Sequence, residues 1–281
     1  PDVFDCWFES GSMPYAQQHY PFENKEKFTK NFPAEFIAEG MDQTRGWFYT
    51  LLVLSTALFD KPPFKNVIVN GIVLAEDGKK MSKRLKNYPD PLALTEKYGA
   101  DAIRFAMMSS PAVRAADMRF SAKLVEETVR SVLLPLWNAY SFFVTYANLA
   151  HFEPSPTPQH SDHPLDRWIR AELQNLTNRM TEEIDRYDLS ATCAELHDTI
   201  DALTNWYIRL SRRRFAGKDA DELGQEGVAT LYDVLLILVR LLAPFCPFIT
   251  DAMYRNLVPG ARNSVHLTDW PEQRLLTSDE C

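Results

Sequence analysis

The sequence predicts a mixed α/β domain over residues 1–115, followed by an all-α domain over residues 116–281. Three observations predict this order. Apolar runs of strand length flank one long helical run before residue 110, amphipathic helical stretches follow one another after it, and a proline-rich connector (152–164) interrupts those helices. A chain of 281 residues has room for roughly one to two domains of about 150 residues each.

The first domain is predicted to contain strand, helix and strand, the unit of a parallel sheet. The apolar run 34–38 predicts a strand ending at Gly40, and residues 42–59 predict a helix that the sequence Lys-Pro-Pro then stops. Residues 67–74 predict the next strand. The dipeptide Asp77-Gly78 predicts a tight turn between extended arms.

The second domain is predicted to be a helical bundle, because long amphipathic stretches are joined by short loops. Ser121 is the expected N-cap of its first helix, which we expect to be kinked or interrupted at Pro135. Trp137 and Trp168 are expected in the core. The predicted helices span residues 121–149, 165–187, 189–215, 222–240 and 247–257.

Composition excludes several classes of protein. Hydrophobic residues make up 46% and charged residues 24%, the mix of a globular protein rather than a disordered one. Charges and prolines break the most apolar stretch (228–249), and no leader pattern follows Pro1, so we expect neither a membrane span nor a signal peptide. The four cysteines form no C-x-x-C pair and no zinc spacing, which predicts reduced thiols, a cytoplasmic protein and no metal site.

The net charge of −8 argues against a generally basic, nucleic-acid-binding surface. Residues 1–120 contain 15 acidic and 15 basic residues, so the remaining residues carry the whole negative charge. Any surface that binds nucleic acid in the second domain must therefore be a local patch.

The first chemical signal is the basic loop 78–84 (GKKMSKR), which directly follows a predicted strand. Flexible ammonium groups on such a loop can neutralise the charge of a polyphosphate and of a departing pyrophosphate. Taken alone, these residues favour the alternative of a solvated basic turn.

The second signal is the segment 39–48 (EGMDQTRGWF), placed where a strand ends and a helix begins. Ligands bind outside the carboxyl ends of strands in open α/β sheets, and Gly40 permits a close backbone approach. Glu39, Asp42 and Gln43 can accept hydrogen bonds from an ammonium group or ribose hydroxyls, while Trp47 can wall an apolar pocket. The alternative is a capped helix start with a buried tryptophan.

Together these two motifs resemble the class I aminoacyl-tRNA synthetases, and within them the isoleucine-specific group. Residues 2–17 (DVFDCWFESGSMPYAQ) and 242–249 (LAPFCPFI) support the resemblance, which covers essentially the whole chain. KMSK-type loops recur across the class, whereas EGxDQxRGWF with WFESGSMPYAQ is a much narrower pattern. Arg84 replaces the commoner serine, a variant that resembles the eukaryotic-like branch. Valine- or leucine-specific enzymes remain alternatives, and the segment around Trp47 favours isoleucine.

The resemblance implies the second half of a Rossmann-like catalytic domain, followed by a helical-bundle anticodon-binding domain. It also implies ATP, with Mg²⁺, and isoleucine as substrates, tRNA(Ile) as partner, and a monomer. The implied ATP-binding residues are Gly71, Val73, Met81, Ser82 and Lys83, with Lys80 and Lys83 as the catalytic cations. The implied aminoacyl-adenylate contacts are Glu39, Gly40, Asp42, Gln43 and Trp47.

The chain departs from the family's pattern in two respects. The HIGH-type motif and the inserted editing domain, which would both precede Pro1, are absent, and no zinc-binding tail is evident after Trp270. The resemblance therefore implies an internal fragment of an isoleucine–tRNA ligase, which we expect to be inactive alone. A non-catalytic tRNA-binding or regulatory module is the alternative, although such a module has no need of the intact lysine loop and the 39–48 segment.

The third signal is the run 206–215 (WYIRLSRRRF). Arg209, Arg212 and Arg213 share one helical face, which suits contacts to phosphates. The alternative is a helix end whose cations complement the helix dipole and pair with carboxylates. Resemblance to the anticodon-domain helices favours contact with tRNA.

Overall fold

The computed structural model describes residues 3–82, 84–155, 160–216, 222–258 and 264–274, with the backbone alone at 222 and 223. Its contacts divide the chain into two compact units. The first comprises Pro1–Leu74 with Pro111–Met118, and the second comprises Ala75–Ser110 with Arg119–Cys281.

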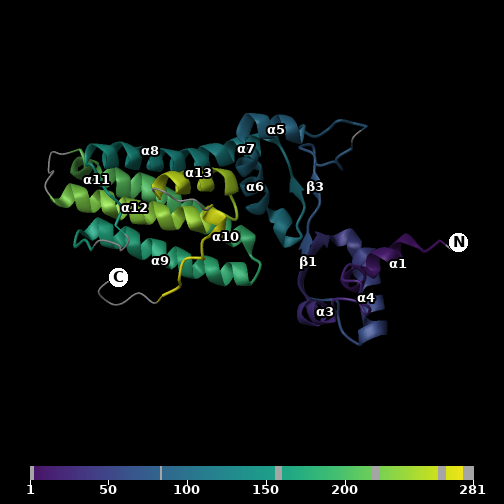
Figure 1. Cartoon of the computed structure of the whole chain (residues 1–281). Coiled ribbons are helices and arrows are strands. Elements are labelled where there is room, and N and C mark those ends of the chain that lie inside the picture. The colour runs from purple at the N-terminus through teal and green to yellow at the C-terminus, as the bar shows by residue number, and fades with distance from the viewer. Residues whose placement is uncertain (1–2, 83, 156–159, 217–221, 259–263, 275–281) are drawn as a thin grey trace. The chain divides into compact units, whose positions relative to one another are not determined.

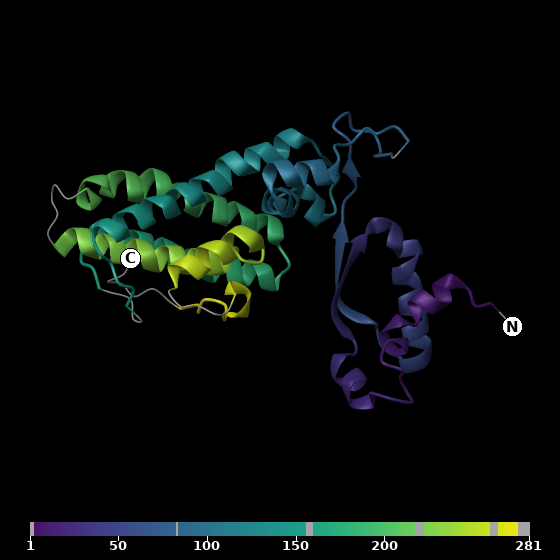
Figure 2. The ribbon, with the colours of Figure 1, turned by 45° about the horizontal axis from the view of Figure 1, so that its top comes forward.

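A two-stranded parallel sheet forms the centre of the first unit. Strands β1 (Ala34–Gly40) and β2 (Phe64–Asn70) are joined through helix α4 (Trp47–Phe59), which packs on one face of the sheet (Figure 2). Ile37, Phe48 and Leu51 form the buried core between helix and sheet. The sequence-predicted order of strand, helix and strand is therefore confirmed.

Further short elements complete the first unit. Helix α1 packs against α4, and Gly11 makes this possible, because a Cβ atom there would come within 2.9 Å of both Leu54 and Thr50. A 3-10 turn precedes β4, which pairs with β3. The bounds are α1 Cys6–Gly11, α2 Met13–Ala16, α3 Lys25–Asn31, β3 Val73–Leu74, the 3-10 turn Pro111–Arg114 and β4 Met118–Arg119.

The second unit is built from helices, and its long helices α8, α9, α10 and α12 lie side by side as a bundle (Figure 1). Their buried side chains form one apolar core, as the amphipathic pattern predicts. The bounds are α5 Pro91–Tyr98, α6 Ala100–Met108, α7 Ala122–Thr128, α8 Leu134–Leu149, α9 Pro164–Asp185, α10 Leu189–Asp201, α11 Arg209–Phe215, α12 Glu222–Leu242, α13 Pro247–Leu257 and a 3-10 turn Val265–Leu267.

Helix α6 is clamped to the junction between α12 and α13. The buried Asp101 carboxylate accepts hydrogen bonds from the backbone N–H groups of Phe248 (3.2 Å) and Ile249 (2.8 Å), in the first turn of α13. Arg104 donates to the carbonyls of Pro244 and Phe245. These bonds give the 242–249 motif a structural role, because its backbone groups receive their partners from α6.

Two of the predicted helices contain a π-helical segment. The helix starting after Ser121 changes to a π-helical segment at Val129–Leu133, before Pro135. Proline lacks an N–H and its ring clashes with the carbonyl four residues earlier, so the disruption falls in the preceding turn. The predicted helix 189–215 likewise contains a π-helical segment, Ala202–Ile208. Ser121 stands at the predicted N-cap, but its side chain makes no capping bond.

The prediction for Trp137 is wrong. This side chain is 46% exposed, whereas the α8 residues that face the bundle, such as Leu136 and Ala139, are buried. Trp168 is half-buried.

Candidate functional site

The carboxyl ends of β1 and β2 bring two predicted site segments together in the first unit. The parallel register pairs Glu39 with Val69 and Gly40 with Asn70. Gly71 therefore follows β2 at the sheet edge where the 39–48 segment leaves β1. Glu39 and Asp42 are both exposed at this edge, so their carboxylates can accept hydrogen bonds from a ligand.

The segment after β1 is a 3-10 turn, Met41–Arg45, and not the first turn of the predicted helix. Gln43 gives this turn its shape: its side-chain oxygen accepts the Trp47 N–H at 3.0 Å, and its side-chain nitrogen donates to Asp42 at 3.3 Å. The first contact satisfies a free N–H at the start of α4. A Cβ atom at Gly40 would lie 2.7 Å from Asp42 Oδ1, so glycine keeps this carboxylate close to the strand end.

Trp47 joins the sheet edge to the N-terminal segment. Its indole N–H donates to the Ser10 carbonyl at 3.0 Å, and its ring packs beside the core of Ile37, Phe48 and Leu51. The indole is partly buried. It therefore fixes the 6–11 helix to the edge while leaving part of its ring accessible.

Gly71 fits against the backbone of the 3-10 turn after residue 110. Its N–H donates to the Ala112 carbonyl at 2.7 Å, and a Cβ atom would lie 1.9 Å from the Ala116 carbonyl oxygen. A side chain at this position requires the backbone to move. Val73 lies in β3 and is partly buried.

The lysine loop begins in the second unit with the predicted tight turn. Gly78 has φ of +80°, its N–H donates to the Ala75 carbonyl, and Ala75 N–H donates to the Lys79 carbonyl. Asp77 accepts the Lys79 N–H at 3.0 Å, which, with the ammonium group of Lys79, lowers the pKa of this carboxyl. The turn prediction is confirmed.

The two lysines at the start of the loop differ in their partners. The Lys79 ammonium pairs with Asp77 at 3.4 Å, whereas Lys80 is exposed and no acidic residue of the described part of the chain pairs with it. Lys80 can therefore receive an external anion without first breaking an ion pair. Met81 and Ser82 are partly buried, and the predicted catalytic residue Lys83 lies outside the described residues.

Asn87 holds this loop in shape, a role that the sequence analysis missed. Its side-chain oxygen accepts the Ser82 N–H at 2.9 Å, and its side-chain nitrogen donates to the Lys80 carbonyl at 3.2 Å. A second residue was missed at the turn: the Arg119 guanidinium lies 3.2 Å from where a Cβ atom of Gly78 would stand. The sequence signal for Asn87 was an asparagine, a residue that favours turns, two positions before Pro89.

The three predicted arginines, Arg209, Arg212 and Arg213, lie exposed on helix α11. Within the described residues, no acidic side chain pairs with Arg209 or Arg212. Their shared face is therefore cationic, in contrast with the negative charge of this half of the chain. The ion pairing that the alternative interpretation requires is not seen for these two arginines.

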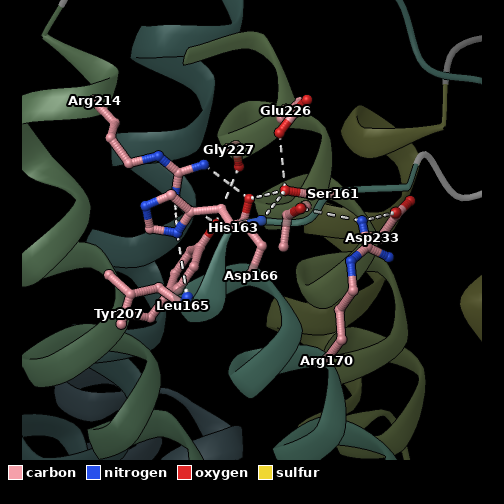
Figure 3. Close-up of polar contacts among 11 residues, drawn as sticks. Ser161, His163, Leu165, Asp166, Arg170, Tyr207, Arg214, Glu226, Gly227 and Asp233 are labelled. Atoms are coloured by element: carbon pink, nitrogen blue, oxygen red, sulfur yellow. Dashed lines mark hydrogen bonds and ion pairs between the residues drawn. The ribbon is translucent and has the colours of Figure 1, made fainter. Parts of the chain in front are cut away.

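The fourth arginine of the run, Arg214, is buried and pairs with Asp166 of α9 (Figure 3). The contact is bidentate, with Nη1 to Oδ1 at 2.9 Å and Nη2 to Oδ2 at 2.8 Å. Tyr207 and Ser161 donate their hydroxyls to the same carboxylate, each at 2.8 Å. Burial raises the pKa of Asp166, but these donors offset it and the net shift is downward.

His163 completes this network as a neutral ring (Figure 3). Its Nδ1 accepts the Leu165 N–H at 3.2 Å as N-cap of α9 and lies 3.1 Å from the Arg214 guanidinium. An atom that accepts from two donors carries no proton. Burial and the charge of Arg214 accordingly lower the pKa of His163.

The predicted residues thus fall into three groups. Glu39, Gly40, Asp42, Gln43, Trp47, Gly71 and Val73 belong to the first unit, the lysine loop to the start of the second, and the arginines to its helical bundle. Burial raises the pKa of the Cys193 thiol to about 12, so it is a poor nucleophile. Within the described ranges, no group of three metal-ligating side chains occurs and no helix is long and apolar enough to cross a membrane.

Comparisons with known proteins agree with the two motifs. The model of the tRNA synthetases class I (I, L, M and V) matches residues 1–119, and the model of the anticodon-binding domain of tRNA ligase matches residues 166–281. Residues 1–119 are therefore similar to the class I tRNA synthetases, and residues 166–281 are similar to the anticodon-binding domain of tRNA ligases. The match to the first model contains both the sheet edge and the lysine loop, and the match to the second contains α11.

Curated relatives carry the name isoleucine–tRNA ligase. One from Protochlamydia amoebophila is 55% identical over 281 residues, which is 100% of this chain and 27% of the relative. One from Treponema denticola is 49% identical, over 96% of this chain and 26% of its own length. A third, from Dictyostelium discoideum and named as cytoplasmic, is 52% identical over the same shares. The chain therefore spans about a quarter of the length of these relatives.

Two solved structures share the fold. LeuRS of Agrobacterium radiobacter K84, solved with tRNA and LeuAMS, has a TM-score of 0.74 and 21% identity, and the match covers 96% of this chain and 33% of the other. A methionyl-tRNA synthetase of Mycobacterium tuberculosis, solved with methionyl-adenylate, has a TM-score of 0.70 and 21% identity over 85% of this chain and 47% of its own. At this identity the likeness concerns the fold.

Proposed function

We propose that this synthetase segment belongs to an isoleucine–tRNA ligase, a cytoplasmic enzyme that activates isoleucine with ATP and transfers it to tRNA(Ile). The observation that carries the proposal is the 55% identity to an isoleucine–tRNA ligase over every residue of the chain. The geometry adds support, since Glu39 and Asp42 are exposed at the sheet edge and Lys80 is exposed in its loop.

In the first reaction, an isoleucine carboxylate oxygen attacks the α-phosphorus of ATP. The bond from this phosphorus to the bridging oxygen breaks, and pyrophosphate leaves with its electrons. Such a step depends on positioning and charge stabilisation more than on a general base. Lys80 and Lys83 supply positive charge to the phosphates in this proposal, and the backbone at Gly71 and Val73 with Met81 and Ser82 lies along the nucleotide. Mg²⁺ enters with ATP as part of the substrate.

The sheet edge holds the amino acid and the adenylate. Glu39 and Asp42 accept from the ammonium group and the ribose hydroxyls, with Gly40 allowing the ligand to approach the backbone. Gln43 and Trp47 shape this edge, because the Gln43 amide fixes the turn and the Trp47 indole is anchored to Ser10. In the second reaction a terminal ribose hydroxyl of tRNA attacks the acyl carbon, and AMP leaves.

Residues 1–115 are, on this proposal, the second half of a Rossmann-like nucleotide-binding fold. The parallel strands with a connecting helix support it. So does the apolar surface of this unit: Phe36 and Val67 on the sheet, and Leu52 and Leu58 on α4, are 47–61% exposed. We infer that further catalytic-domain residues of the complete enzyme cover these side chains, and that this chain does not catalyse activation alone.

A segment exchange tests the proposal. This chain replaces the matched 281 residues of the Protochlamydia relative, and isoleucine-dependent ATP–pyrophosphate exchange is measured with valine and leucine as competitors. We expect exchange that prefers isoleucine. Lys80→Ala should lower the exchange rate on the order of 10²-fold, because one donor that stabilises the developing charge is removed. Lys65→Ala, a surface lysine that pairs with Glu35, is the control. A folded chimera that prefers valine or leucine, or that exchanges equally well without Lys80, contradicts the proposal.

The arginine face is the proposed contact with tRNA. Arg212→Ala with Arg213→Ala is expected to weaken binding of tRNA(Ile). The slope of log K against log salt concentration should become shallower by about 1–2, as the loss of two phosphate contacts predicts. Arg186→Ala is the matched control, since Arg186 is an exposed cation that follows α9, about 30 Å along the helix from the Asp166 end. If the double variant and the control show equal slopes of log K against log salt concentration, the arginines do not contact tRNA phosphates. Their remaining role is then to complement the dipole at the helix end.

A further inference from the structure

A surface hollow of about 320 Å³ lies between helices α9 and α10 and the π-helical segment after α10. Its lining combines two indole rings with two carboxylates: Trp168, Trp206, Asp198, Asp201 and Ala202. None of these residues belongs to the site proposed above. The volume is at the lower end of the range for pockets that bind small molecules.

The π-helical segment brings the tryptophan to the carboxylates. In a regular α-helix Trp206 would be turned by about 140° from Asp201, five residues earlier. In a π-helix, hydrogen bonds join residues five apart, so Trp206 stands over the face that carries Asp201. Asp198 lies one turn before Asp201 on the same face of α10.

The two indoles form an open corner. Their ring centroids are 6.5 Å apart and their planes meet at 48°, with Trp206 61% exposed. Within the described residues, no lysine or arginine lies over either ring, and none pairs with Asp198 or Asp201. Asp201 accepts from the Asn205 amide at 2.6 Å, and Asp198 contacts the His197 ring at 3.2 Å. Both carboxylates therefore keep free lone pairs.

We propose that this corner binds an organic cation, an alkylammonium or guanidinium group. The faces of the indole rings attract a cation, and the carboxylates neutralise its charge and accept its N–H bonds. A bare divalent ion does not fit, because two carboxylates beside aromatic walls fall short of the six or more oxygen ligands that Ca²⁺ requires. A nucleic-acid phosphate is disfavoured by the same two charges. The cation can belong to a basic side chain of a partner protein or to a free polyamine.

The indole N–H resonances of the whole chain provide the test. The six tryptophans give six such signals, and variants Trp168→Phe and Trp206→Phe assign two of them. Choline is titrated as the cationic probe, and 3,3-dimethylbutanol, which has the same shape without charge, is its control. We expect saturable shifts of these two signals with choline and none with the alcohol. The same shifts with both probes, or none with choline, overturn the proposal.

A charge-removing variant tests the role of the carboxylates. Asp198→Asn with Asp201→Asn is expected to raise the Kd for choline at least tenfold, whereas Glu182→Gln, on the exposed face of α9, leaves it unchanged. Circular dichroism confirms that each variant is folded. An unchanged Kd in the double variant contradicts the proposal.

Two further ligands identify the source of the cation. If an arginine-containing peptide amide binds with a Kd at least tenfold lower than that of spermidine, the cation belongs to a partner protein. If spermidine binds more tightly, the cation is a free polyamine. If guanosine shifts the two indole N–H signals and choline does not, the corner binds a nucleobase and the proposal is wrong.

Discussion

The buried pair of Asp166 and Arg214 offers the sharpest test of the helical unit. Asp166 is 0% exposed and accepts four hydrogen bonds, two from the Arg214 guanidinium and one each from the hydroxyls of Tyr207 and Ser161. Asp166→Asn keeps the volume but removes the charge, and the new amide group cannot accept from all of these donors. Arg214, itself 7% exposed, loses this bidentate carboxylate.

We expect this substitution to lower the free energy of unfolding by about 3–5 kcal/mol, the range for removing one partner of a buried ion pair. Urea unfolding followed by circular dichroism measures the effect. At a slope of about 3 kcal/mol per molar urea, the midpoint falls by roughly 1–2 M. Glu182→Gln is the control, because it removes a carboxylate from an exposed pair on the same helix and is expected to cost at most about 1 kcal/mol.

The pH dependence has a defined sign. Since the pKa of Asp166 is lowered in the fold, its contribution is present above its unfolded pKa of about 3.9 and is lost as the pH falls through the folded value. The variant and the parent should therefore converge in stability in strong acid. A loss below about 1 kcal/mol at neutral pH, or a difference that persists at the lowest pH, refutes the reasoning.

Three further predictions concern single residues. Asn87→Ala removes both side-chain hydrogen bonds that hold the lysine loop, and it should reduce kcat/KM for ATP–pyrophosphate exchange in the chimera about tenfold. Asn66→Ala is the control and should leave kcat/KM unchanged, because the Asn66 amide donates to the Glu35 carbonyl and not to the loop. Gly71→Ala should lower the unfolding free energy by about 1–3 kcal/mol, because its Cβ atom would meet the Ala116 carbonyl; a neutral effect in urea unfolding contradicts this packing. Because the pKa of His163 is lowered in the fold, its contribution to the free energy of unfolding is complete above the unfolded pKa of about 6.5 and is lost as the pH falls through the folded value. His163→Asn should therefore flatten the decline in stability between about pH 7 and 5. Parallel curves of unfolding free energy against pH for variant and parent would show that the ring does not titrate in this way.

Local signals predicted the parts of the fold that local chemistry determines. Helix α13 begins at Pro247 and ends at Leu257 as predicted, because proline fits the first helical turn and the apolar pattern ends there. The turn at Gly78 has the positive φ that glycine adopts readily. The parallel register could not be derived from the sequence, yet it joins Gly40 to Asn70 at the edge where the motif had suggested a ligand.

The π-helical segments show what the apolar pattern does not reveal. Apolar side chains recur at similar spacings before, within and after Ala202–Ile208, so the sequence predicts one continuous helix there. The widened turn changes which residues share a face. The relation between Trp206 and Asp201 depends on that change and is invisible to a reading at 3.6 residues per turn.

The arginine run shows why residue type and helical face predict a surface but not the structure beneath it. Arg214 directly follows the exposed Arg212 and Arg213, and its partner is 48 residues away in the sequence, so no local pattern separates it from them. Yet the bond from Arg214 to Asp166 joins the last turn of α11 to the first turn of α9 and so holds the helix that carries the exposed cations. Loss of tRNA affinity in an Arg214 variant is therefore evidence of phosphate contact only if the unfolding free energy is unchanged. Arg212 and Arg213 are exposed, so their side chains can be removed while the buried pair remains.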